Sequence, residues 1–148
     1  MTVDLEVSLG RLKLKNPLIA ASGTFGYGRE YGEIYDVSRL GAVVSKSVTV
    51  NARAGNAPPR VVETACGMLN SIGLANAGLR HFMSEELPAM RRLGTAVIVN
   101  IAGKTVAEFE ELGEAAFQRR LCGRVSGEDK KEGKEVSEWS SSSVHEVR

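Results

Sequence analysis

The sequence has few of the residues that build metal sites or disulfide frameworks. Its 148 residues contain two cysteines and two histidines. Cys66 and Cys122 have neither a zinc-ligand spacing nor the pattern of a disulfide-stabilised domain. Free cysteines suit a reducing compartment, so we expect a cytoplasmic protein without a structural metal.

Long hydrophobic runs and an excess of charge of one sign are also absent. No apolar run approaches the roughly 20 residues of a membrane span, and the N-terminal MTVDLEVSLG has no apolar core typical of a signal peptide. The net charge of +1 does not predict binding to nucleic acid or to an anionic membrane. With 43% hydrophobic and 25% charged residues, the chain has the composition of a globular domain with a core.

The apolar pattern predicts an N-terminal hairpin followed by alternating strands and helices. Residues 4–15 alternate around Gly10, as in a short hairpin. Three apolar runs are typical of strands buried on both faces of a parallel sheet: 18–21, 42–44 and 95–99. Helical spacing covers three further ranges, the second of which Pro88 is expected to divide: 29–40, 77–93 and 105–118. This order predicts an α/β fold made of βαβ units.

Segment 51–76 has no sustained period and is long for a connection in a compact domain. It nevertheless carries apolar residues, including Met68 and Leu69, that need a surface to pack on. We therefore expect an ordered lid or binding loop rather than a disordered linker.

A polar side chain follows each of the three predicted parallel strands. Ser22, Lys46 and Asn100 stand at these ends, and Lys46 has Ser45 and Ser47 on either side. Because the carboxyl ends of parallel strands meet at one edge, these side chains should share a rim that the long segment covers. A lysine, an amide and hydroxyls suit an anionic, planar ligand that forms hydrogen bonds. In the alternative interpretation these are ordinary polar strand ends, and Lys46 extends into solvent.

Five segments together resemble the dihydroorotate dehydrogenase family, and most of all its NAD-linked class 1B catalytic subunit. They occur in the family's order between about residues 3 and 115: NPLIAASGTFGYGREY, SKSVT, GNAPPRVVET, GMLNSIGLANAGL and VNIAG. The resemblance implies an α/β fold that is a partial TIM barrel, the N-terminal part of an FMN-dependent (β/α)8 barrel with a hairpin and about three βα units. Residues 1–116 are expected to form this part, and residues 117–148 an aberrant or disordered tail.

The resemblance also implies site residues, cofactors and partners. The FMN contacts correspond to Ser22, Lys46, Ser47 and Asn100, and Lys46 also reaches the substrate. The loop that holds dihydroorotate or orotate corresponds to five consecutive residues: Asn70, Ser71, Ile72, Gly73 and Leu74. A full-length enzyme would assemble as a homodimer, or as a heterotetramer with an electron-transfer subunit. That subunit carries FAD and an iron–sulfur cluster and delivers electrons to NAD.

The chain departs from the family pattern in its last third. The family's catalytic base is a cysteine in a segment resembling ELNISCPN, and no such segment is present. Cys122, in RRLCGRVSG, does not match it, and Cys66 is expected to be a small packed residue, so no catalytic residue is assigned. The serine-rich end leads to the hypothesis of a shifted reading frame, which sequencing of the downstream DNA would test.

Three functions stay open at this point. The first is oxidation of dihydroorotate to orotate in pyrimidine biosynthesis, with this chain as a truncated catalytic subunit. The second is a non-catalytic fragment whose exposed strand edges favour aggregation. The third is another pyrimidine-binding flavin oxidoreductase, such as a dihydropyrimidine dehydrogenase.

Overall fold

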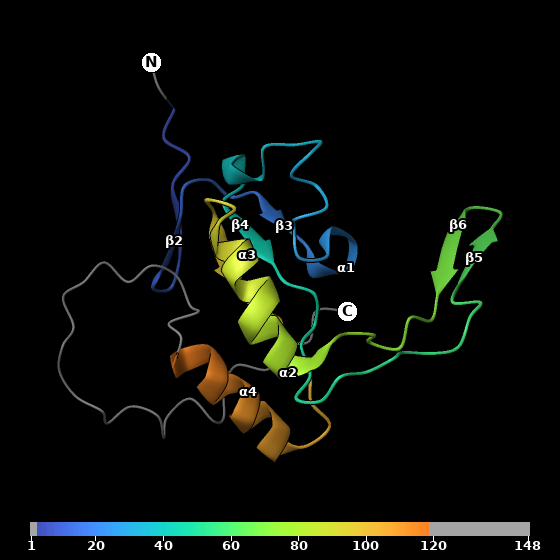
Figure 1. The fold of residues 1–148 in the computed structure, drawn as a ribbon. Helices are drawn as coiled ribbons and strands as arrows, with labels where there is room; N and C mark the ends of the chain where they lie inside the picture. The colour runs from blue at the N-terminus through green and yellow to red at the C-terminus, as the bar shows by residue number, and fades with distance from the viewer. Residues whose placement is uncertain (1–2, 119–148) are drawn as a thin grey trace.

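The computed structural model describes residues 3–118 and begins with the predicted hairpin (Figure 1). Strands β1 (Val7–Leu9) and β2 (Leu12–Leu14) pair in antiparallel fashion. Gly10 makes the turn between them with a φ of 59°, a conformation that favours glycine. The sequence prediction of this hairpin is confirmed.

A three-stranded parallel sheet forms the centre of the fold. Its order is β3-β4-β7, with these bounds: β3 (Ile19–Ala20), β4 (Ala42–Val44) and β7 (Ala96–Ile98). The central strand is buried, with Ala42 and Val43 both 0% exposed. The prediction that the first strand is buried on both faces is wrong, since Ile19 is 39% exposed. The reason is position, because β3 is an edge strand in the part of the chain that the structure describes.

The predicted helix over 29–40 is not present. A short helix α1 (Ser22–Phe25) precedes this segment, and a 3₁₀ turn η1 (Val37–Arg39) lies at its end. Separate turns fill the space between them, as when Gly32 N donates to Arg29 O at 3.1 Å. The tyrosine and valine spacing was helical, but Gly32 weakens a helix and favours turns. The structure is therefore mixed α/β with a parallel sheet, and the first crossover is largely irregular.

The second predicted helix forms, and a separate helical piece begins at Leu87, next to Pro88, as predicted. Three pieces follow one another: α2 (Gly78–His81), the π-helical turn η2 (Phe82–Glu86) and α3 (Leu87–Arg91). Leu87 N donates to Phe82 O, five residues earlier, which is the π-helical pattern. The wide turn just before Pro88 accommodates a residue that has no N–H for the helix ladder.

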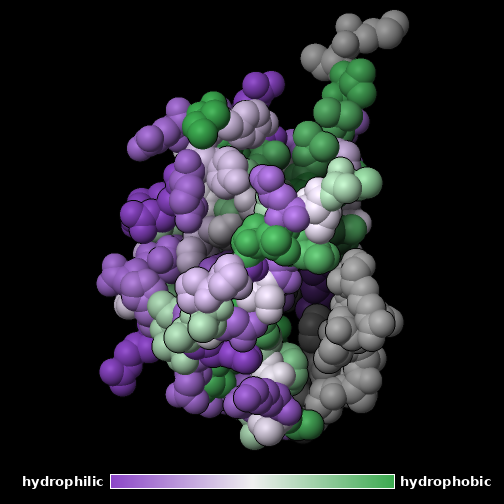
Figure 2. Space-filling model, turned by 90° about the vertical axis from the view of Figure 1, so that its right-hand side faces the viewer, coloured by the Kyte–Doolittle hydropathy of each residue, from purple (hydrophilic) through white to green (hydrophobic). Residues whose placement is uncertain are grey.

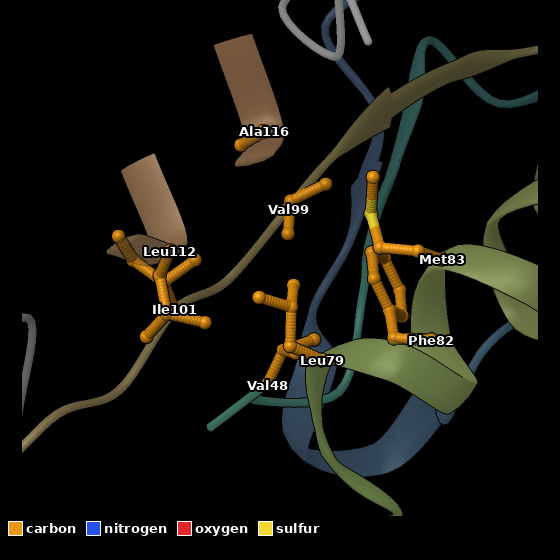
Figure 3. Close-up of a pocket in the computed structure, with 8 residues that line it drawn as sticks. All are labelled: Val48, Leu79, Phe82, Met83, Val99, Ile101, Leu112 and Ala116. Carbon is orange, nitrogen blue, oxygen red and sulfur yellow. The ribbon is translucent and has the colours of Figure 1, made fainter. Parts of the chain in front are cut away.

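The last helix, α4 (Val106–Gln118), forms as predicted and completes the core. Thr105 Oγ1 accepts a hydrogen bond from Glu108 N at 3.3 Å, as expected for an N-cap. Figure 3 shows side chains of α2, η2 and α4 pointing toward the residues that follow β4 and β7. These are Val48, Leu79, Phe82, Met83, Val99, Ile101, Leu112 and Ala116, and they leave no room for a water molecule between them.

An exposed arm between β4 and α2 was not predicted as strands. It is an antiparallel hairpin of β5 (Val61–Thr64) and β6 (Gly67–Asn70), and all eight residues are exposed. Figure 1 shows it extending away from the sheet. The side of the molecule that carries the arm faces the viewer in Figure 2, where hydrophobic groups lie among hydrophilic ones. Cys66 lies in the exposed turn, so its prediction as a packed residue is wrong.

Two further predictions meet the limits of the described chain. Within residues 3–118, no helix is both long and apolar enough to cross a membrane. The predicted aberrant tail, 117–148, lies almost entirely outside the described residues.

Candidate functional site

Three of the predicted site residues occupy equivalent positions at the carboxyl edge of the sheet. Ser22, Lys46 and Asn100 each lie two residues beyond the end of a strand: β3, β4 and β7. The strands are paired in parallel, so their ends meet at the same edge. Local apolar runs and the parallel arrangement together position the three residues.

Asn100 connects the two outer strand ends through its amide group. Its Nδ2 donates to Ser22 Oγ at 3.2 Å and to Ser47 Oγ at 2.9 Å. Both serine hydroxyls accept from the amide, so each retains its own proton as a donor. The prediction that Ser22 and Asn100 share a rim is confirmed, and Ser47 joins them.

Ser45 stabilises this rim through buried hydrogen bonds, a role that the sequence did not reveal. It is 0% exposed, and its backbone N donates to Ile98 O at 2.8 Å. Its hydroxyl donates to Lys46 O at 3.0 Å and accepts from Asn100 N at 3.1 Å. A buried hydroxyl is stable only with such partners, and here they bind the end of β4 to the end of β7. The only signal in the sequence was a serine next to a buried strand.

Lys46 is half-buried, and its backbone is fixed against the glycine-rich loop of residues 23–28. Its N donates to Gly26 O at 2.9 Å. Within residues 3–118, its ammonium has no carboxylate partner and no hydrogen bond. A cation held at a strand end without a partner is available to an anionic ligand.

Aromatic packing keeps the glycine-rich loop in place. The rings of Phe25 and Tyr31 stack with centroids 4.3 Å apart and planes 9° apart. Tyr31 also donates its hydroxyl proton to Thr24 O at 2.7 Å. These two rings therefore pack against one another. Nearby, burial and the carboxylates of Glu86 and Glu30 raise the pKa of Tyr27.

The predicted substrate loop, Asn70 to Leu74, lies in the arm and not over the rim. Ser71 N donates to Arg60 O at 2.8 Å, and Asn56 N donates to Ile72 O at 3.1 Å. The expectation of a lid that covers the strand ends is therefore wrong for this conformation (Figure 1). Backbone hydrogen bonds between the two sides of the arm hold this segment, instead of contacts with the sheet.

The base of the arm is held by Asn76, a residue that the sequence analysis did not select. Its Oδ1 accepts from Gly78 N at 2.9 Å and from Thr49 N at 3.3 Å. Its Nδ2 donates to Leu74 O at 2.7 Å and to Thr49 Oγ1 at 3.0 Å. One side chain thus connects the end of the arm, the start of α2 and the segment after β4. The sequence signal was an Asx turn in Asn76-Ala77-Gly78.

The chemistry of the rim is that of hydrogen-bond donors and one cation. In the part of the chain that the structure describes, no group of three or more His, Cys, Asp or Glu residues could hold a metal ion. The donor set of Ser22, Ser47 and Lys46 suits an electron-rich planar molecule or an anion. None of the five rim residues is a cysteine, a histidine or a carboxylate: Ser22, Ser45, Lys46, Ser47 and Asn100.

Sequence comparison relates this chain to known proteins. Residues 4–119 match the family model described as dihydroorotate dehydrogenase. A protein of Thermoanaerobacter pseudethanolicus named dihydroorotate dehydrogenase B (NAD(+)), catalytic subunit, is 60% identical over 107 residues. The alignment covers 72% of this chain and 35% of that protein.

Two further relatives match at lower identity. The catalytic subunit of the same name in Carboxydothermus hydrogenoformans is 51% identical over 114 residues, which are 77% of this chain and 37% of that protein. A putative dihydroorotate dehydrogenase A (fumarate) of Aquifex aeolicus is 51% identical over 110 residues, 74% of this chain and 36% of the relative. The chain thus spans little more than a third of the length of these relatives. Since the family model matches most of its residues, the chain belongs to the dihydroorotate dehydrogenase family.

Proposed function

We propose that this chain is the N-terminal portion of a dihydroorotate dehydrogenase B catalytic subunit, which oxidises dihydroorotate to orotate in pyrimidine biosynthesis. The observation that carries the proposal is the cluster of Ser22, Ser47 and Asn100 beside Lys46, whose ammonium has no partner within residues 3–118. Residues 3–116 would form the first βα units of a (β/α)8 barrel, whose active site lies at the carboxyl ends of the strands. The protein would act in the cytoplasm.

The rim residues fit a flavin by the chemistry of their donor set. The hydroxyl protons of Ser22 and Ser47 can donate to ring carbonyl oxygens, and Asn100 fixes both hydroxyls in place. Lys46 would place a positive charge beside the ring system, where negative charge develops on reduction. Bound FMN would supply the acceptor for the hydride that leaves dihydroorotate. The proposed FMN contacts are therefore Ser22, Lys46, Ser47 and Asn100.

The substrate contacts are proposed to be Lys46 and the segment from Asn70 to Leu74. Leu74 has a φ of 54° and is the one non-glycine residue with positive φ among residues 3–118. Gly73 precedes it with a φ of 75°. Strained backbone of this kind gathers at ligand-binding loops, which supports a binding role for the segment. Binding of the substrate at Lys46 would require the arm to move toward the rim.

A general base is not assigned in this chain. The cysteine segment implied by the family resemblance has no counterpart in the sequence, and Cys66 lies in the exposed turn of the arm. We therefore expect this polypeptide alone to bind FMN without oxidising dihydroorotate. The complete enzyme would work as a homodimer or heterotetramer with an electron-transfer subunit that carries FAD and an iron–sulfur cluster and passes electrons to NAD.

The test is a titration of the purified 148-residue chain with FMN, followed by the visible spectrum and flavin fluorescence. We expect a saturable spectral change, and roughly tenfold weaker binding for Lys46→Ala because a charge-assisted contact is lost. Lys13→Ala is the matched control, since Lys13 lies on β2 with a side chain 76% exposed. No spectral change, or equal affinity of wild type and Lys46→Ala, would contradict the proposal. Bleaching of the bound flavin by dihydroorotate would contradict the expectation that this chain lacks a base.

A further inference from the structure

We propose that the chain has a second anion-binding site, between the segment after β4 and the start of α4. A cavity of about 190 Å³ lies there. It is lined by Thr49, Val50, Asn51, Arg53, Ala102, Gly103, Lys104 and Glu108. None of these residues belongs to the proposed FMN or substrate contacts, so this site does not depend on the proposed function.

Arg53 is the principal cation of this cavity, and its backbone is fixed. Arg53 N donates to Asn76 O at 2.8 Å, and Asn76 N donates back to Arg53 O at 2.9 Å. Asn76 itself is held by the side-chain hydrogen bonds described above, so the position of Arg53 is tied to the segment after β4 and to the start of α2. The residue is half-buried. Among the described residues, its guanidinium has no ion pair and no hydrogen bond, which leaves all five donors available.

Lys104 adds a second cation from the other wall. It is exposed, and its ammonium also has no partner within residues 3–118. Glu108 is the only carboxylate in the lining, and it is engaged at the start of α4, where its Oε2 accepts from Lys104 N. Two cations against one occupied carboxylate give the cavity a net positive charge. Since the start of a helix also favours negative charge, the two effects act in the same direction.

The lining indicates a small anion with a short apolar part. Arg53 can bind a carboxylate or a phosphate through two parallel hydrogen bonds, and Lys104 can neutralise a second charge. Val50 and Ala102 provide apolar wall. Thr49 contributes no free donor, because its hydroxyl donates to Asn51 O at 2.6 Å. The volume exceeds by more than tenfold the roughly 15 Å³ that one ordered water requires. Carboxylate and phosphate share this chemistry, and separate titrations distinguish them.

The experiment is an NMR titration of the ¹⁵N-labelled 148-residue chain with inorganic phosphate and, separately, with acetate. Sodium chloride at equal ionic strength is the reference. We expect saturable shifts of the amide signals of Arg53 and Gly103 with at least one of the two anions. Arg53→Gln should weaken that binding roughly tenfold, and Lys104→Gln less because its side chain is exposed.

Two matched pairs test whether the effect is local. Glu108→Gln keeps an oxygen that can accept from Lys104 N but removes the charge, so it should tighten binding severalfold. Glu110→Gln, on an exposed position of α4 outside the lining, should not. Arg11→Gln, in the turn of the first hairpin, should leave affinity unchanged. Lys46→Ala should weaken FMN binding and leave phosphate or acetate binding unchanged, which separates this proposal from the previous one.

Three results would overturn the proposal. The first is the absence of saturable shifts with both anions in the folded chain. The second is equal affinity of wild type and Arg53→Gln, and the third is equal effects of Glu108→Gln and Glu110→Gln on that affinity.

Discussion

Asn100 Nδ2 donates to Ser22 Oγ at 3.2 Å and so joins β7 to β3, two strands that are not neighbours in the sheet. The bond passes over the end of β4, and the same Nδ2 also donates to Ser47 Oγ. The rim is therefore a cross-strand unit rather than three independent side chains. Its members should be energetically coupled, and their coupling can be measured.

The first prediction concerns this coupling. Asn100→Ala removes both amide bonds and should lower the free energy of unfolding by about 1–2 kcal/mol, and Ser22→Ala by less. In a double-mutant cycle by urea unfolding, the two changes should show a coupling energy of about 0.5–1 kcal/mol. Additive effects would show that the hydrogen bond contributes nothing to stability. Asn100→Ala with Ser8→Ala, on distant β1, is the control pair that should be additive.

The second prediction concerns Gly41, which precedes β4. A Cβ at this position would clash with Asn16 O, a backbone atom that cannot move aside independently. Gly41→Ala should therefore destabilise the chain by about 2 kcal/mol or more through local strain. Gly67→Ala is the matched control, because a Cβ at Gly67 would have no neighbouring atom within 4 Å. Thermal or urea unfolding measures both, and similar losses for the two variants would refute the explanation.

The third prediction is a pH effect at Tyr27. Burial raises its pKa above the usual 10.0, and the carboxylates of Glu86 and Glu30 raise it further. Because the folded-state pKa lies above the unfolded one, this stabilising contribution is complete below the unfolded pKa and is lost as pH rises through the folded pKa. An absorbance titration at alkaline pH should show one tyrosine that ionises later than the others. Tyr27→Phe should remove that late step, and its persistence would assign the effect to another tyrosine.

The fourth prediction concerns the arm formed by β5 and β6. Val62 and Leu69 are opposite one another in the hairpin and are 58% and 64% exposed. An exposed apolar hairpin with free edges favours association between molecules. Leu69→Lys should reduce light scattering of concentrated solutions and change the free energy of unfolding by less than about 0.5 kcal/mol. Leu12→Lys, at a half-buried position of β2, should not reduce scattering; an equal reduction there would show a nonspecific charge effect.

The sequence predicted those parts of the fold whose signal is local. Buried strands have short apolar runs; β4 was found at the predicted run 42–44, and β7 lies within the predicted run 95–99. The arm was missed because β5 and β6 are exposed on both faces, so no alternation of apolar and polar residues marks them. The prediction of a helix over 29–40 was wrong because the helical spacing of tyrosines was outweighed by Gly32 and the separate turns around it.

The arrangement of the candidate site could likewise be predicted only in part. The rule that parallel strands end at one edge was enough to bring Ser22 and Asn100 together from the sequence alone. The roles of Ser45 and Asn76 depend on partners distant in the sequence, Ile98 and Thr49, and no local pattern encodes those contacts. The direction of the arm likewise depends on the backbone pairing of its two sides.

The parallel sheet also has a kinetic consequence. Each pairing in it, such as Ala42 with Ala96, joins residues far apart in the sequence, so long loops must close before the strands meet. The rim hydrogen bonds can form only after the sheet has assembled, whereas the β1–β2 hairpin and α4 can form early from neighbouring residues. Folding should therefore be slow relative to helical proteins of this size, and the carboxyl edge of the sheet, where we propose that the ligand binds, should be among the last parts of the chain to become ordered.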